Sequence, residues 1–330
     1  MILGIKKKRI KKELTPREYY NKRNKILLTY DARGIGDILN IRMLFKNFKS
    51  LAPDSHITFA CFDQYKELLQ NHPYLDDVIS SKNINLDNYV ASYDITTTCI
   101  HYESYQMGKN TKHRAEIWAD HCGIPLESKD MHLPIIKNEK IIEGGLEIKQ
   151  LRGISTREQN KDGPSVLFSP LAFEVIRSLT VVQMKETVKF LKDKGLFVFV
   201  THDTPIQIYQ EMDLPMLIGN TLSDWMSYVY NADYVVTVDT ATFHYAGGLG
   251  KPLTGIFTHV DGKLRGKFYD FVLVQKHRDN GDWSCGPCYN YLHCSHPKCD
   301  KQSMVRPCLT ELNPEEIKVG IEKMLYNCPI

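Results

Sequence analysis

The sequence predicts an α/β protein made of two doubly wound domains that face a cleft. Two strand–turn–helix units support this prediction, one in each half of the chain. Residues 25–30 form an apolar run that enters a glycine-containing turn and then an amphipathic segment from Ile38. Residues 234–238 form a β-branched run that stops at Asp239 and leads into a short Ala/Gly-rich segment. Each unit carries polar groups at the carboxyl end of its strand, where open α/β sheets bind ligands.

The first half of the chain alternates strands and helices. We expect strands over residues 56–62 and 93–97, and helices from about Tyr65 and across residues 114–121. Between residues 138 and 164 the pattern changes to charged, glycine-containing sequence, which indicates a linker, although a helix can occupy part of it. The expected divisions are a basic extension over residues 1–24, a first domain over 25–150 and a second domain over 151–330.

The second half restarts with predicted strands over residues 166–169 and 197–201. Helix starts are marked by cap residues, and these are Thr180 with Gln183, Thr221 with Asp224, and Asn313 with Pro314 and Glu316. The helix that follows Thr180 is expected to stop at Gly195. These signals predict the same alternation of strand and helix in the second domain.

Length and composition indicate an ordinary globular protein. At 330 residues with 42% hydrophobic residues, the chain can build two sizeable cores. Its mean hydropathy is −0.33, and no apolar run approaches the roughly 20 residues that span a bilayer. The apolar start before Lys6 is too short for a signal peptide, so we expect a cytoplasmic protein. A formal net charge of +3 argues against a general polyanion binder.

Residues 6–25 are strongly basic, unlike the rest of the chain. A solvated arm is the simpler interpretation of such a run. The alternative is contact with an anionic membrane surface, which would place the protein peripherally at the inner face of a membrane. Nucleic-acid binding has less support, because the only interleaved aromatic residues are Tyr19 and Tyr20.

The first turn carries Arg33, Gly34, Gly36 and Asp37 between strand and helix. Its glycines allow another group to approach the backbone closely. Asp37 stands at the helix start, where its carboxylate faces the top of the sheet, and the alternative role is that of a helix cap. The third glycine of a dinucleotide-binding G-x-G-x-x-G turn is missing, so a dinucleotide site has weak support.

The second turn, from Asp239 to His244, presents unpaired backbone N–H groups and the positive end of a helix dipole. The hydroxyls of Thr240 and Thr242 and the imidazole of His244 add donors that suit a phosphate. The alternative is that Asp239 only caps the helix and His244 is a packed core residue.

Five of the nine cysteines fall between residues 285 and 308. Cys285 and Cys288 flank a Gly-Pro turn that suits two thiolates on one metal ion. We expect one structural iron or zinc ion, with Cys308 as the third ligand and Cys299, or alternatively Cys294, as the fourth. Disulfides and free thiols are the alternatives, and a reducing compartment argues against disulfides. The scattered cysteines are interpreted as packing residues, namely Cys61, Cys99, Cys122 and Cys328.

Two segments resemble glycosyltransferase family 9, the ADP-heptose:lipopolysaccharide heptosyltransferases. Residues 33–79 begin RGIGDIL and end NHPYLDDVI, similar to the G-D turn and the N-P-x-L/I-D-x-V/I motif of that family, with one inserted residue. Residues 218–257, which contain IGNTLSDW and VDTATFHYAGG, resemble its C-terminal D-T/S-G-x-x-H signature. The resemblance spans residues 25–321. Two departures are Ala241 in place of the usual glycine, and Leu179 in place of a tryptophan near the matching Arg177.

The resemblance implies a GT-B fold, in which two Rossmann-like domains hold the active site between them. It implies an inverting glycosyltransferase of the kind used in lipopolysaccharide biosynthesis. Such an enzyme moves a sugar, heptose foremost, from a nucleotide-diphosphate sugar such as ADP-heptose to a glycan, lipid-linked or protein acceptor. Asp37 is then the general base, with Arg33, Gly34 and Gly36 on the acceptor side. The implied donor-binding residues are Ser169, Arg177, Thr201, Asp239, Thr240, Ala241, Thr242 and His244.

The same resemblance has implications for a catalytic metal and for a structural metal site. No catalytic metal is expected, because protein cations neutralise the departing nucleotide diphosphate. Autotransporter heptosyltransferases of the family carry an iron-binding cysteine finger, which supports a metal site within residues 285–308 without fixing the metal. Two other interpretations stay open, namely a catalytically silent protein that binds a sugar nucleotide or a partner, and a metal-finger nucleic-acid binder.

Overall fold

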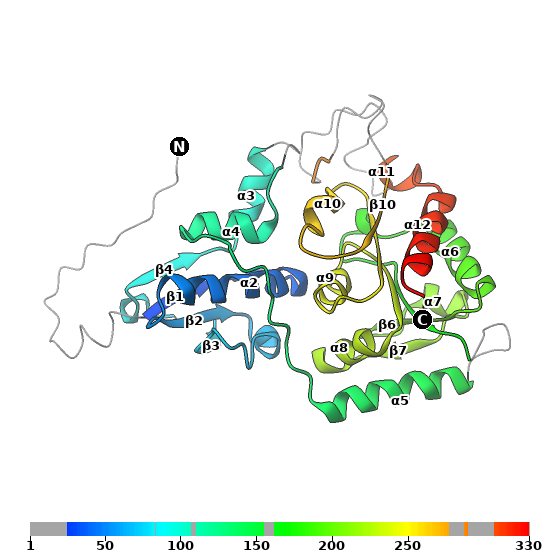
Figure 1. The fold of residues 1–330 in the computed structure, drawn as a ribbon, viewed down its shortest axis with the longest axis horizontal. Helices are drawn as coiled ribbons and strands as arrows, with labels where there is room; N and C mark the ends of the chain where they lie inside the picture. Colours follow the sequence, from blue (N-terminus) through cyan, green and yellow to red (C-terminus); the bar gives the residue numbers. More distant parts are fainter. Residues whose placement is uncertain are drawn as a thin grey trace, which may run out of the picture.

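The computed structural model describes residues 25–82, 84–106, 110–154, 162–276, 287–289 and 307–329. Figure 1 shows two α/β domains side by side, the first drawn in blue to cyan and the second in green to red. The first holds a parallel sheet in the order β3-β2-β1-β4, and the second a parallel sheet in the order β10-β9-β8-β5-β6-β7. The expected class, two doubly wound domains, is confirmed.

The first domain is built from the elements that follow. They are β1 (Lys25–Thr29), α2 (Ile35–Leu51), β2 (His56–Cys61), the 3₁₀ helix η1 (Asp63–Leu68), β3 (Asp77–Ser80), η2 (Leu86–Asn88), β4 (Ala91–Asp94), α3 (Thr98–Tyr105) and α4 (Arg114–Cys122). The expected helix near Tyr65 is wrong as an α-helix, because this short stretch forms η1. The strand expected over residues 93–97 lies earlier as β4, since the Asp94 side chain accepts a hydrogen bond from the Thr96 N–H and turns the chain.

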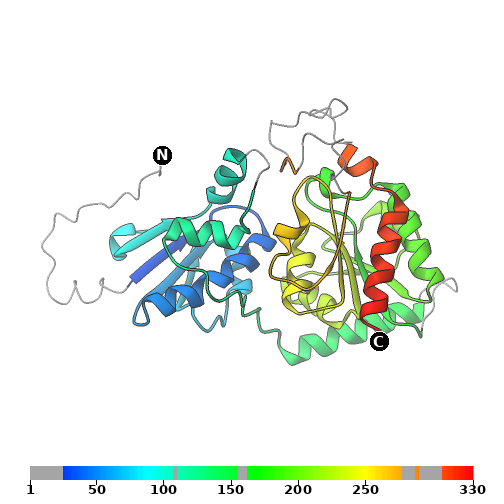
Figure 2. The ribbon, with the colours of Figure 1, turned by 45° about the horizontal axis from the view of Figure 1, so that its top comes forward.

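The second domain starts after the long helix α5 (Asn138–Ile154). Its elements are β5 (Ser165–Ser169), η3 (Val175–Arg177), α6 (Val181–Asp193), β6 (Phe197–His202), α7 (Gln207–Glu211), β7 (Met216–Ile218), α8 (Leu222–Asn231), β8 (Tyr234–Val238), α9 (Ala241–Gly248), β9 (Leu253–Phe257), α10 (Gly262–Arg265), β10 (Val272–Gln275), α11 (Pro307–Thr310) and α12 (Pro314–Asn327). Figure 2 shows α12 lying along the outer side of this domain, where it packs on β9, β10 and α6.

Three helix starts form as the sequence predicts. Capping boxes begin α6 at Thr180, α8 at Thr221 and α12 at Asn313. In each box the cap side chain and the third helical residue satisfy backbone N–H groups that would otherwise lack partners.

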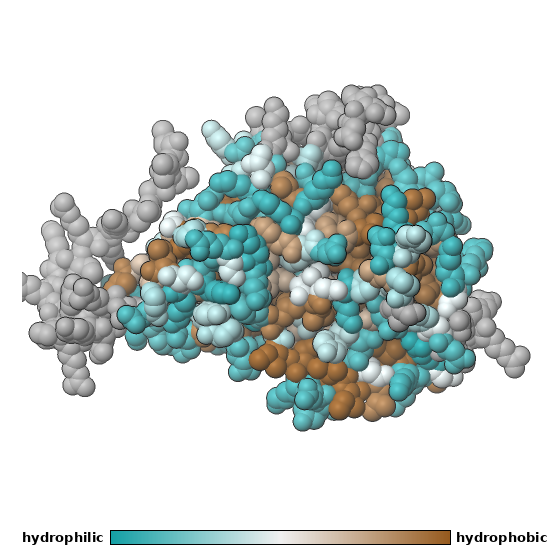
Figure 3. Space-filling model, in the orientation of Figure 1, coloured by the Kyte–Doolittle hydropathy of each residue, from teal (hydrophilic) through white to brown (hydrophobic). Residues whose placement is uncertain are grey.

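The segment expected as a linker is largely the helix α5, which runs across the predicted division at residue 150 and packs against α8. Gly144 permits this contact, because a Cβ there would lie 2.3 Å from the Ser227 hydroxyl oxygen. Figure 3 shows apolar side chains gathered over the start of α5, where Ile135, Ile142 and Leu146 are exposed.

No helix in the described ranges is long and apolar enough to cross a membrane. The basic extension over residues 1–24 lies outside the described residues, so its contact with a membrane stays a prediction. Three of the cysteines interpreted as packing residues are buried, namely Cys61, Cys99 and Cys122, whereas Cys328 is partly exposed.

Candidate active site between the two domains

The structure brings the two turns singled out in the sequence into contact. The first turn of α2 packs against α9, which begins within the second turn, at Ala241. Gly36 makes the contact possible, because a Cβ there would lie 2.8 Å from the Cδ2 atom of His244. The carboxyl ends of β1 and β8 therefore meet across the domain boundary, as expected for a cleft between doubly wound domains.

Asp37 lies at the centre of this contact. The helix α2 begins at Ile35 with Gly34 as its cap, so the interpretation of Asp37 as a helix cap is wrong. Its Oδ2 atom instead accepts a hydrogen bond of 2.7 Å from the Tyr30 hydroxyl, and its Oδ1 lies 2.7 Å from Nη1 of Arg114. Burial alone would raise the pKa of Asp37, but the Arg114 charge and these hydrogen bonds outweigh it and lower the pKa below its ordinary value. Asp37 is therefore ionised at neutral pH.

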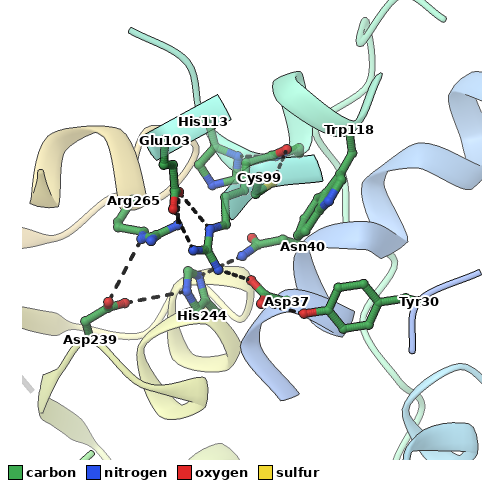
Figure 4. A network of polar contacts seen from close by, with 12 residues as sticks. Tyr30, Asp37, Asn40, Cys99, Glu103, His113, Trp118, Asp239, His244 and Arg265 are labelled. Atoms are coloured by element: carbon green, nitrogen blue, oxygen red, sulfur yellow. Dashed lines mark hydrogen bonds and ion pairs between the residues drawn. The ribbon is translucent and has the colours of Figure 1, made fainter. Parts of the chain in front are cut away.

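A chain of buried and partly buried ion pairs extends from Asp37 into the second domain (Figure 4). Nε and Nη2 of Arg114 each donate a 2.9 Å hydrogen bond to one oxygen of Glu103. Glu103 also lies 3.3 Å from Nη1 of Arg265, which belongs to α10 of the second domain. Nε of Arg265 lies 3.9 Å from Oδ2 of Asp239. Charged side chains of both domains thus form one network.

Asp239 follows β8 and is almost fully buried. The cap residue of α9 is Thr240, so the interpretation of Asp239 as its cap is also wrong. Nη1 of Arg177 lies 3.2 Å from the backbone oxygen of Asp239 and 3.5 Å from its Oδ2. Burial opposes ionisation, yet the charges of Arg265 and Arg177 prevail and lower the pKa of Asp239 to about 2. Arg177 and Asp239, expected together from the sequence, do meet.

The other residues expected on the donor side lie at or just after neighbouring strand ends. Ser169 ends β5, Thr201 is near the end of β6, and Thr242 is in the first turn of α9. The hydroxyl of Ser169 lies 3.5 Å from that of Thr242, and the hydroxyl of Thr240 lies 3.1 Å from that of Thr237. The Thr201 hydroxyl is shielded from solvent and has no hydrogen-bond partner among the residues that the structure describes.

Ala241, where the resembling family has glycine, is the first residue of α9. In the first domain, Gly34 lies beside Asp37, since a Cβ there would be 3.0 Å from Oδ2. Arg33 is exposed to solvent.

His244 is buried at the domain contact. Its Nδ1 atom lies 3.3 Å from the Asn40 amide nitrogen and 3.2 Å from the Tyr269 hydroxyl, which donates to the Asn40 Oδ1 at 2.8 Å. Burial lowers the pKa of His244 to about 4, so the ring is neutral at physiological pH. The packed-residue interpretation therefore describes the ring well, and its Nε2 atom lies 4.0 Å from Oδ1 of the buried Asp239.

Of the five clustered cysteines, Cys288 and Cys308 lie within the described residues, Cys288 buried and Cys308 partly exposed. Cys285, Cys294 and Cys299 lie outside them. No group of three or more potential metal ligands occurs in the described ranges, so those ranges alone do not test the expected metal site.

Sequence reasoning missed several residues of the network, namely Tyr30, Asn40, Glu103, Arg114, Arg265 and Tyr269. Arg114 stands at a predicted helix start, but nothing in its neighbours relates it to Asp37, which is 77 positions away. A weak signal is their position in the topology. Glu103 and Arg114 are charged residues on α3 and α4, which follow β4. β4 pairs with β1, the strand that precedes Asp37.

No protein-family model and no curated protein matches the sequence. Solved structures do match the fold. The glycosyl transferase family 9 structure from Veillonella parvula has a TM-score of 0.62 and 11% identity, covering 93% of this chain and 98% of that one. The iron-containing dodecameric glycosyltransferase TibC from enterotoxigenic E. coli has a TM-score of 0.66 and 12% identity over 93% of this chain and 77% of that one. The E. coli ADP-heptose lps heptosyltransferase II has a TM-score of 0.55 and 13% identity over 92% and 99%. The chain therefore has the GT-B fold of these glycosyltransferases, as the sequence predicts.

Proposed function

We propose that the chain is a glycosyltransferase that moves a sugar, heptose foremost, from a nucleotide-diphosphate sugar to a hydroxyl of a glycan, lipid-linked or protein acceptor. The observation that carries this proposal is the contact between the Asp37 turn of the first domain and the Asp239–His244 turn of the second. An ionised carboxylate, Asp37, faces the Asp239–His244 turn of the other domain across a contact between α2 and α9. ADP-heptose is the favoured donor, because the TibC structure with ADP-D-beta-D-heptose and the E. coli WaaC structure with ADP share the fold.

The donor half-site is assigned to the second domain. The diphosphate gains negative charge as its bond to the sugar breaks, and arginines together with helix-terminal N–H groups stabilise such charge. Arg177 is the most exposed of the three arginines in the network, with 25% of its side chain accessible, and we expect it to contact the diphosphate. The Thr201 hydroxyl, which has no hydrogen-bond partner among the described residues, adds a hydrogen-bonding group at the same sheet edge.

Asp37 is the proposed general base. The acceptor oxygen attacks the anomeric carbon while its proton passes to an oxygen of Asp37. The bond between that carbon and the diphosphate oxygen breaks on the opposite face, and its electron pair leaves with the diphosphate. Attack opposite to the leaving group inverts the anomeric configuration. The arginines of the cleft supply the neutralising charge, so this scheme needs no catalytic metal.

Replacing Asp37 tests the role of the base. We expect Asp37→Asn to keep the fold and the affinity for ADP-heptose while it lowers kcat by roughly 10²–10⁴. Asp31→Asn is the matched control, because Asp31 is an exposed carboxylate of the same turn. Near-normal turnover of Asp37→Asn, measured as release of ADP in the presence of acceptor, would contradict the assignment.

The metal site is part of the proposal. We expect one structural iron or zinc ion on four of Cys285, Cys288, Cys294, Cys299 and Cys308, and no role for it in the chemistry. Metal binding of this kind contributes directly to folding. Elemental analysis of protein purified without added metal should find about one iron or zinc per chain. Metal-free protein that keeps its full melting temperature would exclude a structural ion.

A further inference from the structure

Both oxygens of Asp37 are held by donors from the first domain. The Tyr30 hydroxyl bonds Oδ2, and Nη1 of Arg114 bonds Oδ1, each at 2.7 Å. Burial, followed by the neighbouring Asp37 charge, raises the pKa of Tyr30, so its hydroxyl stays protonated and donates. Because a carboxylate oxygen can accept two hydrogen bonds, neither contact uses the whole accepting capacity of its oxygen.

Arg114 is itself held in place. Its Nε and Nη2 atoms form a bidentate pair with the two oxygens of Glu103, both at 2.9 Å, and this planar geometry leaves the guanidinium little freedom to rotate. The Glu103 side chain is only 4% exposed. Arg265 approaches Glu103 from the second domain at 3.3 Å, so the second domain also contributes to the support behind Arg114.

We propose that Arg114, buttressed by Glu103, is a positioning residue that keeps Asp37 ionised and aimed into the cleft. This inference rests on the proposed function for its catalytic consequence. The effect on the carboxylate itself does not depend on catalysis. A fixed cation 2.7 Å from one oxygen of Asp37 favours the ionised form of the carboxyl and holds it in one orientation. A misplaced base lowers the rate by up to about 10²-fold, since catalysis depends on the alignment of the reacting atoms.

The charge on Asp37 depends on every group that faces it. These groups are Tyr30 after β1, Cys99 and Glu103 of α3, Arg114 of α4, His244 of α9 and Arg265 of α10. His244 is neutral at physiological pH, and burial raises the pKa of Cys99, so neither carries charge there. Glu103 opposes ionisation of Asp37, and the two arginines favour it. Of these cations, only Arg114 hydrogen-bonds Asp37.

The test follows the Asp37 carboxyl by ¹³C NMR in protein labelled at aspartate, with Asp37→Asn used to assign the signal. In the wild type we expect a titration midpoint below the ordinary value of 3.8. Arg114→Gln should raise the midpoint, and Arg114→Lys, which keeps the charge but loses the bidentate pair, should raise it less. Lys112→Gln is the matched control, because it removes another cation next to α4 that pairs with Asp120 rather than Asp37.

Turnover is measured on the same proteins. Arg114→Gln should lower kcat by about 10- to 100-fold, with the donor KM changed less than about threefold, and should move the acid limb of the kcat profile to higher pH. Arg114→Lys should recover part of kcat. A wild-type midpoint at or above 3.8, or an unchanged midpoint in Arg114→Gln, would overturn the inference. The wild-type titration decides it even if the variants fail to fold. The expected titrations in a protein without transferase activity would uphold the positioning role and reject the proposed function instead.

Discussion

Gly36→Ala tests the closeness of the two domains at the candidate site. Gly36 lies in the first turn of α2, and a methyl group there would meet the His244 ring of α9 at 2.8 Å. Ordinary van der Waals contact begins at 3.4 Å, so the ring and the new Cβ would be too close by 0.6 Å. The ring is buried between Asn40, Tyr269 and Phe243, and it cannot move aside freely.

The cost follows from overpacking. An extra methyl group in a well-packed contact costs about 1–3 kcal/mol, and alanine regains at most about 1 kcal/mol over glycine within a helix. We therefore expect Gly36→Ala to lower the free energy of unfolding by about 1–2 kcal/mol. Part of the loss should appear as a weaker contact between the domains, because the clash lies at their boundary.

Urea unfolding measures the change, and small-angle X-ray scattering reports any separation of the domains. Gly153→Ala is the matched control, because Gly153 is also helical and a Cβ there would meet no atom within 4 Å. We expect the control to be as stable as the wild type or slightly more stable. A Gly36→Ala protein as stable as wild type and equally compact would refute the close contact of α2 with α9.

Two further predictions concern titration and the donor half-site. Burial lowers the pKa values of His72 to about 3 and of His244 to about 4, and it also lowers those of His113 and His132. The unfolded chain therefore binds more protons below pH 6.5, and stability should fall as the pH drops from 6.5 towards 4; equal urea midpoints at pH 7 and pH 4.5 would contradict this. Arg177→Ala should weaken ADP binding about tenfold or more in calorimetric titrations while adenosine binding changes little, since the lost contact is to phosphate; equal losses for both ligands would contradict the assignment.

Local features of the fold follow from the sequence. The capping boxes at Thr180, Thr221 and Asn313 form as predicted, because each depends on residues only three positions apart. The strand-to-helix turns at Asp37 and Asp239 also form, since an apolar run that ends in a polar turn is a local pattern.

Two features of the structure depend on tertiary packing and could not be predicted from local sequence, namely the helix α5 and the partners of Asp37. The charged sequence around Gly144 and Gly145 predicts a linker. It is helical in α5 instead, and both glycines fit closely against α8. Glycine is a poor helix former, so this packing overrides local propensity. The partners of Asp37 could not be predicted for a related reason, since Arg114 and Arg265 reach the cleft from elements distant in the chain and carry no local signal.

Binding of a nucleotide-diphosphate sugar tests the central claim most directly. A ligand that binds only the folded state at 100 times its Kd adds about 2.7 kcal/mol of stability, which thermal unfolding detects readily. We predict that ADP-heptose raises the Tm of the full chain more than GDP- or UDP-sugars do, and that Arg177→Ala reduces this rise. No change in Tm with any nucleotide-diphosphate sugar at millimolar concentration would contradict the assignment of this cleft to a glycosyltransferase.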